Sequence, residues 1–253
     1  MRLARFRSGD RISTGTVGDD DVSPLRGTFF EDPIPIGETL PLTEVRLLAP
    51  IIPSKVICIG RNYVEHAEEL GSEIPAEPLM FMKPSTAVVG PEDLIRLPPE
   101  SERVDHEGEL AVVIGRPCRR VSEEEAPAFI LGYTCGNDVT ARDLQKKDGQ
   151  WTRAKGFDSF CPLGPWVETD LDLSDLEIST KVNGEVRQRG QTSDMIFPPA
   201  LLVAYVSRVM TLLPGDVILT GTPSGVGPLS QGDRVEVEVE GIGVLANGVT
   251  SGD

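Results

Sequence analysis

Two glutamates stand one residue apart in the segment DHEGEL at 105–110, directly before a strongly apolar run. In an extended segment side chains alternate between faces, so Glu107 and Glu109 point the same way, roughly 6–7 Å apart. Carboxylates at that spacing repel each other unless something neutralises them, and a divalent cation would do so. Taken alone, the pair could equally be the solvated edge of an acidic protein, where most charged residues lie.

A third carboxylate follows a predicted strand at 130–135, in the segment NDVTARDLQ at 137–145. Asp138, at the end of that strand, is a candidate third oxygen ligand. Three carboxylates suit a hard cation, Mg²⁺ or Mn²⁺, with positions left for water and substrate. Arg142 and Gln145 lie one helical spacing apart and could together hold a substrate carboxylate. The alternative for Asp138 is a helix N-cap, with Arg142 on the surface.

A histidine and a lysine complete the set of candidates. The segment 64–71 predicts a short helix, on which His66 and Glu69 share a face. A carboxylate that orients a histidine makes it a better general base, although an exposed His–Glu pair is the open alternative. Lys155 lies in a predicted buried loop, where it would need negative charge beside it; an exposed loop lysine is the other interpretation.

Short strands and few helices must position these side chains. The β-branched run at 55–60 and the apolar run at 110–115 predict buried strands, and Asn183-Gly184 predicts a hairpin. A helix is expected between Pro198-Pro199 and Pro214. We therefore predict a β-rich α+β fold, a sandwich or barrel-like roll rather than a doubly wound sheet. Residues 1–50 are expected to form a small β-rich N-terminal module and residues 51–253 the catalytic domain.

Composition limits the classes of partner. The formal net charge of -16 disfavours nucleic acid and anionic membrane surfaces, and no apolar run is long enough to span a bilayer. No secretory signal is present, and the four dispersed cysteines indicate neither a zinc site nor disulfides, so we expect a cytoplasmic protein. The G-x-G-x-x-A match at 241–246 has no helix and second strand after it, so we interpret it as a turn between strands.

In their order along the chain, these segments resemble the fumarylacetoacetate hydrolase family over roughly residues 55 to 249. The resemblance rests on six motifs, with no departure at the expected ligand or catalytic positions. They are GRNYxxHxxE at 60–69, FMKP at 81–84, DHEGEL at 105–110, NDVTARDLQ at 137–145, AKGFD at 154–158 and GTPSGVG at 221–227.

The resemblance implies the family's mixed β-sandwich roll, a homodimer, and Mg²⁺ or Mn²⁺ on Glu107, Glu109 and Asp138. It implies that His66 and Glu69 lie on a lid helix and activate water, and that Lys155 stabilises developing negative charge. Arg142, Gln145 and Thr222 would contact substrate, with Lys83 a further candidate. The N-terminal module resembles an extension of bacterial members described as 2-hydroxyhepta-2,4-diene-1,7-dioate isomerases, which act in aromatic catabolism.

The leading functional hypothesis is an enzyme acting on a small 2-oxo acid or its enol. The cation would chelate the carboxylate and 2-oxo oxygen and stabilise an enolate, reversing locally the negative field of the protein. Hydrolysis of an acylpyruvate, isomerisation of an unsaturated dioate, and oxaloacetate decarboxylation or tautomerisation all share that enolate, so the choice stays open. A hypothesis of another class is a non-catalytic metal- or anion-binding protein.

Overall fold

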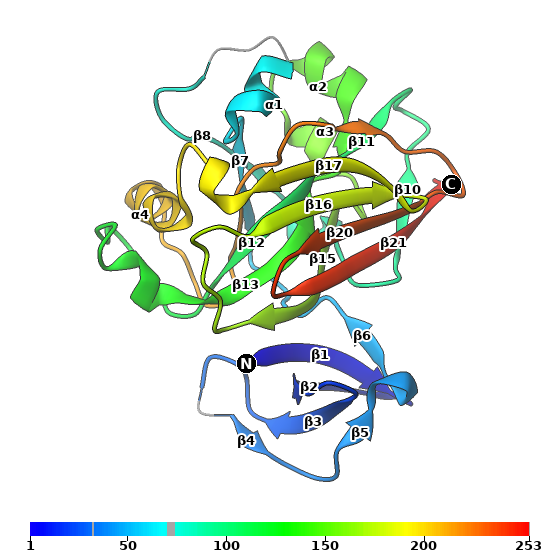
Figure 1. Ribbon diagram of the computed structural model, residues 1–253, viewed down its shortest axis with the longest axis vertical. Coiled ribbons are helices and arrows are strands. Elements are labelled where there is room, and N and C mark those ends of the chain that lie inside the picture. Colours follow the sequence, from blue (N-terminus) through cyan, green and yellow to red (C-terminus); the bar gives the residue numbers. More distant parts are fainter. Residues whose placement is uncertain (32, 70–73, 253) are drawn as a thin grey trace.

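The structure, a computed structural model, describes residues 1–31, 33–69 and 74–252, and it is rich in strands as predicted. A large mixed sheet runs through the whole molecule (Figure 1). Its main path is β4 (Ile34–Pro35), β3 (Asp21–Arg26), β2 (Arg11–Val17), β1 (Arg2–Ser8), β15 (Cys161–Glu168), β13 (Ile130–Asn137), β12 (Gly108–Ile114), β18 (Val217–Leu219), β7 (Val56–Gly60) and β8 (Leu79–Lys83). Three short strands pair at its sides, β5 (Leu40–Pro41), β6 (Arg46–Leu48) and β9 (Val88–Val89).

A second sheet packs against one face of the first, which gives the expected sandwich. Its order is β10 (Leu94–Leu97), β21 (Gly243–Ser251), β20 (Arg234–Val239), β16 (Glu177–Val182) and β17 (Glu185–Gln191). A third small sheet holds β14 (Thr140–Ala141), β11 (Val104–His106) and β19 (Gly227–Pro228). The predicted Asn-Gly hairpin is confirmed between β16 and β17, with positive φ at both turn residues.

Four α-helices and four 3₁₀ turns connect the described strands. The helices are α1 (Val64–Glu69), α2 (Arg142–Asp148), α3 (Thr152–Lys155) and α4 (Pro199–Val209). The 3₁₀ turns are η1 (Leu42–Glu44), η2 (Ser85–Ala87), η3 (Ala126–Phe129) and η4 (Thr192–Asp194). No helix of the described chain is long and apolar enough to cross a membrane.

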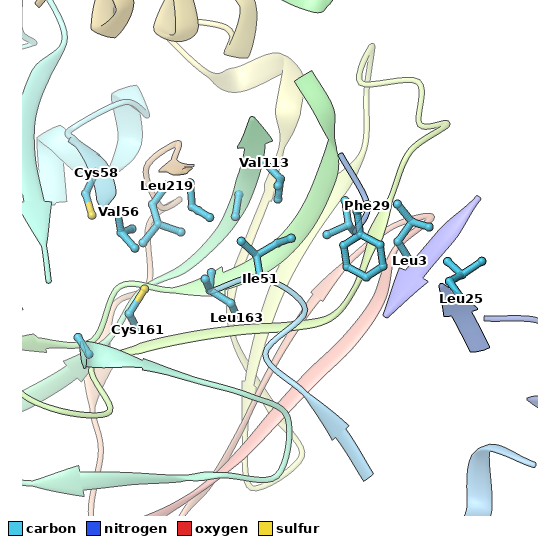
Figure 2. Packing of buried hydrophobic residues seen from close by; sticks show 14 residues of the cluster. Leu3, Leu25, Phe29, Ile51, Val56, Cys58, Val113, Cys161, Leu163 and Leu219 are labelled. Atoms are coloured by element: carbon cyan, nitrogen blue, oxygen red, sulfur yellow. The ribbon is translucent and has the colours of Figure 1, made fainter. Parts of the chain in front are cut away.

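The apolar run of β12 is explained by burial on both of its faces. Val112 and Ile114 pack with residues of α4, whereas Ala111 and Val113 belong to the cluster shown in Figure 2. A strand covered on both sides needs no alternation of polar residues, so its sequence is continuously apolar. This central strand is therefore a rigid support for Glu109, its second residue.

The helix expected before Pro214 is shorter than predicted. It ends at Val209, because Met210 is extended. Helix α1 is described to Glu69, so the expected stop at Gly71 lies outside the described residues. The G-x-G-x-x-A segment is a turn into β21, as interpreted from the sequence.

Candidate active site

A cavity of about 250 Å³ lies where α1, α2 and α3 meet the ends of β7 and β12. These helices gather at the end of the molecule opposite the N-terminal strands (Figure 1). Eight of the sequence-predicted site residues line the cavity, namely His66, Glu107, Glu109, Asp138, Arg142, Gln145, Lys155 and Thr222.

The three predicted carboxylates form one buried cluster. One oxygen from each of Glu107, Glu109 and Asp138 lies within 4.8 Å of the others. Glu107 is not part of a continuous strand, contrary to the sequence interpretation, because β11 ends at His106 and β12 begins at Gly108. The break is held by Asn137, whose Oδ1 accepts the Glu107 N–H at 3.0 Å.

Two cations partly neutralise this cluster. The Lys155 ammonium donates to Glu107 at 2.8 Å and to Asp138 at 2.6 Å. The Arg142 guanidinium bonds to Glu107, to Asp105 at 2.9 Å and to Gln145 at 2.7 Å. Three of its five N–H donors are thereby used, and two remain. Lys155 was expected in a loop, but it is the last residue of the short helix α3. Its predicted burial beside negative charge is confirmed.

The charge balance is uneven across the three carboxylates. Burial opposes ionisation of Glu107, but Lys155 and Arg142 outweigh burial and lower its pKa. For Glu109, burial and the nearby charges of Asp138 and Glu107 raise the pKa well above its usual range. Burial would also lower the pKa of Lys155, yet Asp138 and Glu107 outweigh it, so that pKa is raised. The cluster therefore lacks positive charge at its Glu109 end.

A divalent cation fits this deficit. Glu109 receives a single hydrogen bond from described residues, from the Gly221 N–H at 2.7 Å. Asp138 Oδ1 is fully buried and accepts no hydrogen bond within the described ranges, although Lys83 Nζ lies 2.5 Å from it outside hydrogen-bonding geometry. Carboxylate oxygens with free lone pairs are the ligands that Mg²⁺ and Mn²⁺ prefer. These three residues would hold the ion.

The predicted His–Glu pair forms on α1. His66 Nδ1 and Glu69 Oε2 are 3.3 Å apart, and the imidazole is buried and lines the cavity. Glu69 lies behind the histidine and contacts the loop after β18, through the Gly225 N–H at 3.2 Å. This hydrogen bond links helix α1, which carries the pair, to the segment that follows β18.

Lys83 is buried behind the carboxylates and does not line this cavity. Its ammonium donates to the Val139 carbonyl at 3.0 Å and to the Lys155 carbonyl at 2.7 Å, beside Asp138. A lysine with its donors directed at the protein supports the segments that carry Asp138 and Lys155. This geometry favours a positioning role over the expected contact with substrate.

Thr222 belongs to a network that sequence reasoning missed. Its hydroxyl donates to the Gly108 carbonyl at 2.8 Å and accepts from the Gln188 amide at 2.7 Å. The same Gln188 accepts from the Gly108 N–H and contacts His106 Nδ1, both at 3.0 Å. Gln188 differs from its neighbours on β17 only because it is buried, whereas Arg187 and Arg189 are exposed. Burial of a single polar residue cannot be predicted from one sequence.

Other contributors were missed although they stand inside the recognised motifs. Asp105 is buried and pairs with Arg142, and Asn62 is buried with its side chain bonded to Phe197 and Thr220, not capping α1. Arg61 and Lys146 line the cavity. The sequence could have suggested both residues, because Arg61 lies within GRNY and Lys146 directly follows NDVTARDLQ.

Comparison with known proteins agrees with the fold. The family description "Fumarylacetoacetate (FAA) hydrolase C-terminal" matches residues 55–250, and "Rv2993c-like, N-terminal" matches residues 1–50. The crystal structure of 5-carboxymethyl-2-hydroxymuconate delta-isomerase from Mycobacterium smegmatis is 53% identical, covers all of both chains and superposes with a TM-score of 0.94.

Two further relatives carry functional names. The 2-hydroxyhepta-2,4-diene-1,7-dioate isomerase from Mycobacterium marinum is 51% identical over 99% of this chain and 98% of its own, with a TM-score of 0.93. The mitochondrial oxaloacetate tautomerase of Rattus norvegicus is 45% identical over 83% of this chain and 71% of its own length.

A strand-rich sandwich with a buried carboxylate cluster, a paired lysine and a His–Glu helix at one cavity defines an enzyme of the isomerase and hydrolase type. The chain belongs to the fumarylacetoacetate hydrolase family.

Proposed function

We propose that this protein is a divalent-metal-dependent enzyme acting on a small 2-oxo acid or its enol, of the 2-hydroxyhepta-2,4-diene-1,7-dioate isomerase or acylpyruvate hydrolase type. The observation that carries the proposal is the cluster of Glu107, Glu109 and Asp138 on the wall of one cavity. Mg²⁺ or Mn²⁺ suits these ligands. The names of the two mycobacterial isomerases support a dioate substrate.

Each cavity residue has a task in this proposal. A bound divalent cation supplies Lewis-acid stabilisation of negative charge on the substrate's oxygens. Arg142, through its two unused donors, and the Gln145 amide N–H₂ bind the substrate's carboxylate. Thr222, whose hydroxyl proton is donated to Gly108, contacts the substrate as part of the cavity wall. Lys155 keeps a positive charge in a buried place, because Asp138 and Glu107 favour its protonated form. That charge stabilises the negative charge that develops when the substrate enolises.

The His–Glu pair provides the proton transfer. With Nδ1 of His66 donating to Glu69, Nε2 is the unprotonated nitrogen and can act as the base. In hydrolysis, His66 would take a proton from water; in isomerisation, it would move a proton between carbons. Both tasks need the same position on the cavity wall.

A second candidate is oxaloacetate tautomerase or decarboxylase activity. The 45% identical relative named oxaloacetate tautomerase favours it. Tautomerisation interconverts keto and enol forms and needs one base beside the carbon acid, which His66 can supply. It differs from hydrolysis because no water molecule enters the reaction.

One experiment separates these activities. The purified protein is assayed with an acylpyruvate, oxaloacetate and an unsaturated 2-hydroxy dioate, with Mg²⁺ and Mn²⁺ in parallel and after chelation. We expect turnover of at least one of them, lost on chelation. His66→Ala should lower hydrolysis roughly 10²–10⁴-fold, the typical size of a general-base contribution, and oxaloacetate decarboxylation far less. Full turnover in chelator, or binding without turnover of any of them, would reject an enzyme of this kind.

The division into residues 1–50 and 51–253 remains a proposal, as does the homodimer. Strand β8 is an edge strand among the described residues, and its Leu79 and Met82 are exposed, which supports a partner at this edge. Sedimentation analysis of the purified chain measures the second proposal directly.

A further inference from the structure

Two basic side chains on the cavity wall have no partner of opposite charge among the residues that the structure describes. Arg61 follows β7, and Lys146 lies on the exposed side of α2. Across the described ranges, neither makes an ion pair within 4 Å or a side-chain hydrogen bond. By contrast, Arg142 and Lys155, on the same wall, are bonded to the carboxylate cluster. The unpaired cations are therefore available to a ligand.

Formal charge indicates what kind of ligand. The three cavity carboxylates and the adjacent buried Asp105 are opposed by Arg142, Lys155 and Lys83, which leaves one net negative charge. A divalent cation reverses this balance to one positive charge, enough for a single substrate carboxylate. Arg61 and Lys146 add positive charge that no described group on the wall offsets. The complete site thus suits an acid with two negative charges.

The backbone holds Arg61 in an unusual conformation. Its φ of 58° lies in the left-handed region, which is unfavourable for an L-residue other than glycine. The next residue enforces it, because the buried Asn62 amide donates to the Phe197 and Thr220 carbonyls at 2.9 and 2.7 Å. Strain of this kind persists where surrounding contacts over-determine a residue, and it clusters at ligand clamps.

We propose that Arg61, assisted by Lys146, binds the second carboxylate of a dicarboxylic 2-oxo acid and selects dioates over monocarboxylic acids. The inference rests on the proposed function, which places the first carboxylate and 2-oxo group at the carboxylate cluster. A guanidinium presents paired donors to a carboxylate, so Arg61 provides most of the affinity. Lys146, an exposed point charge, contributes less.

Binding measurements with two matched ligands test this assignment. The wild-type protein with saturating Mn²⁺ is titrated calorimetrically with 2-oxoadipate and with 2-oxohexanoate, which differ only in a terminal carboxylate or methyl group. We expect the wild type to bind 2-oxoadipate at least about tenfold more tightly. Arg61→Gln should weaken 2-oxoadipate binding roughly 10–100-fold, as loss of a charge-assisted hydrogen bond does, and leave 2-oxohexanoate within about twofold.

Three further variants complete the design. Lys146→Gln should weaken 2-oxoadipate binding about 2–5-fold, the range of an exposed ion pair. Arg61→Lys should recover part of the preference. The matched control is Lys147→Gln, because Lys147 is the exposed neighbour on α2 and does not line the cavity. If Arg61→Gln does not fold, Arg61→Lys and Lys146→Gln decide, and unchanged preference in both rejects the proposal.

The binding data distinguish a wrong role for Arg61 from a wrong proposed function. Equal binding of both acids to the wild type, or equal losses for both in Arg61→Gln, would overturn the role of Arg61 and leave the proposed function standing. If neither acid binds the Mn²⁺-loaded wild type, the proposed function fails as well, and this inference with it.

Discussion

At the residue scale, the negative charges of the carboxylate cluster lower the stability of the metal-free protein, although the proposed function requires them. Glu109 is buried beside two other carboxylates, and burial and their charges raise its pKa. In the metal-free protein its negative charge is therefore unfavourable, whereas in a metal-loaded protein the same charge would be a ligand. Sites that need such groups are less stable than their neutral variants.

This conflict predicts the behaviour of Glu109→Gln. We expect the metal-free variant to be at least as stable as the wild type, because a buried charge among like charges is removed. The wild type should gain about 2.7 kcal/mol at Mn²⁺ one hundredfold above its dissociation constant, or roughly 5–11 °C in melting temperature. Glu109→Gln should lose that gain together with activity. Thermal unfolding with Mn²⁺ and with chelator measures both, and Glu124→Gln, on an exposed turn, is the control. A retained Mn²⁺ shift would show that Glu109 is not a ligand.

Lys83 gives a second prediction at this scale. Lys83→Met leaves Asp138 with one fewer counter-charge and two buried carbonyls without a donor. Removing one member of a buried pair costs about 3–5 kcal/mol, whereas Lys147→Gln on the surface should stay within about 0.5 kcal/mol. Denaturant unfolding measures the difference. If Lys83 only positions other residues, the metal-saturated Lys83→Met variant should have nearly the same KM for its substrate as the wild type. A large rise in KM with little loss of stability would instead indicate that Lys83 contacts the substrate.

At the element scale, the second sheet reaches into the site through one side chain. Strand β17 belongs to the sheet that packs on β12, and its Gln188 accepts from the Gly108 N–H and donates to the Thr222 hydroxyl. The Thr222 hydroxyl in turn donates to the Gly108 carbonyl. There is no room for a side chain at Gly108, where a Cβ atom would lie 2.0 Å from Thr180 Oγ1. The carboxylate-bearing turn is therefore held between the two sheets.

Gln188→Leu should loosen this turn without unfolding the protein. Residues that orient metal ligands typically change metal affinity or activity 10–100-fold, and we expect a loss of Mn²⁺ affinity in that range. The control is Arg189→Gln, because the adjacent side chain on β17 points outward. Mn²⁺ affinity by calorimetry, measured beside the melting temperature of the metal-free variants, checks the prediction. Equal affinity in both variants would show that the carboxylates need no such support.

The same elements show what could be predicted from sequence. The carboxylates, Arg142 and Lys155 were candidates from local patterns that each had a surface alternative. The order of the motifs along the chain, which resembles the family, favoured the site. Strands β7, β12 and β13 were found because continuous apolar runs predict buried strands. Gln188 and Asp105 were missed because their importance comes from contacts with distant segments, and nothing local distinguishes them from surface polar residues.

Conformation at single residues was also beyond prediction. The left-handed backbone of Arg61 depends on hydrogen bonds from Asn62 to segments more than 130 positions away. Similarly, the break between β11 and β12 depends on Asn137 and Gln188, so the sequence predicted one continuous strand there. The two-residue spacing correctly placed the carboxylates of Glu107 and Glu109 near each other. The reason was only partly correct, because the strand is interrupted at Glu107.

At the scale of the whole molecule, the net charge of -16 must be reconciled with the acidic substrate that we propose. The structure does this by concentration of basic groups, since four of them line the cavity within a protein that is otherwise acidic. The site lies at one end and the N-terminal strands at the other (Figure 1), and none of the described residues in 1–50 lines the cavity. We therefore expect the N-terminal segment to contribute to the fold.

That segment shares its core with the catalytic domain. Strand β1 pairs with β15 through Arg2 and Leu3, and Phe29 packs in one cluster with Val113 and Leu163 (Figure 2). A common core links the unfolding of the two parts, so we expect one calorimetric transition for the whole chain. Two separate transitions would show that residues 1–50 unfold independently.

Phe29→Ala tests the shared core directly. Truncating a buried phenylalanine costs about 3–5 kcal/mol, which lowers the melting temperature of a protein of this size by roughly 6–20 °C. Because the lost contacts join both parts, the entire transition should shift as one. Ile36→Ala, in the same segment but 43% exposed, should shift it little. If Phe29→Ala creates an early partial transition and leaves the main one in place, the N-terminal segment folds on its own, and its packing against β15 adds little to the stability of the domain that carries the site.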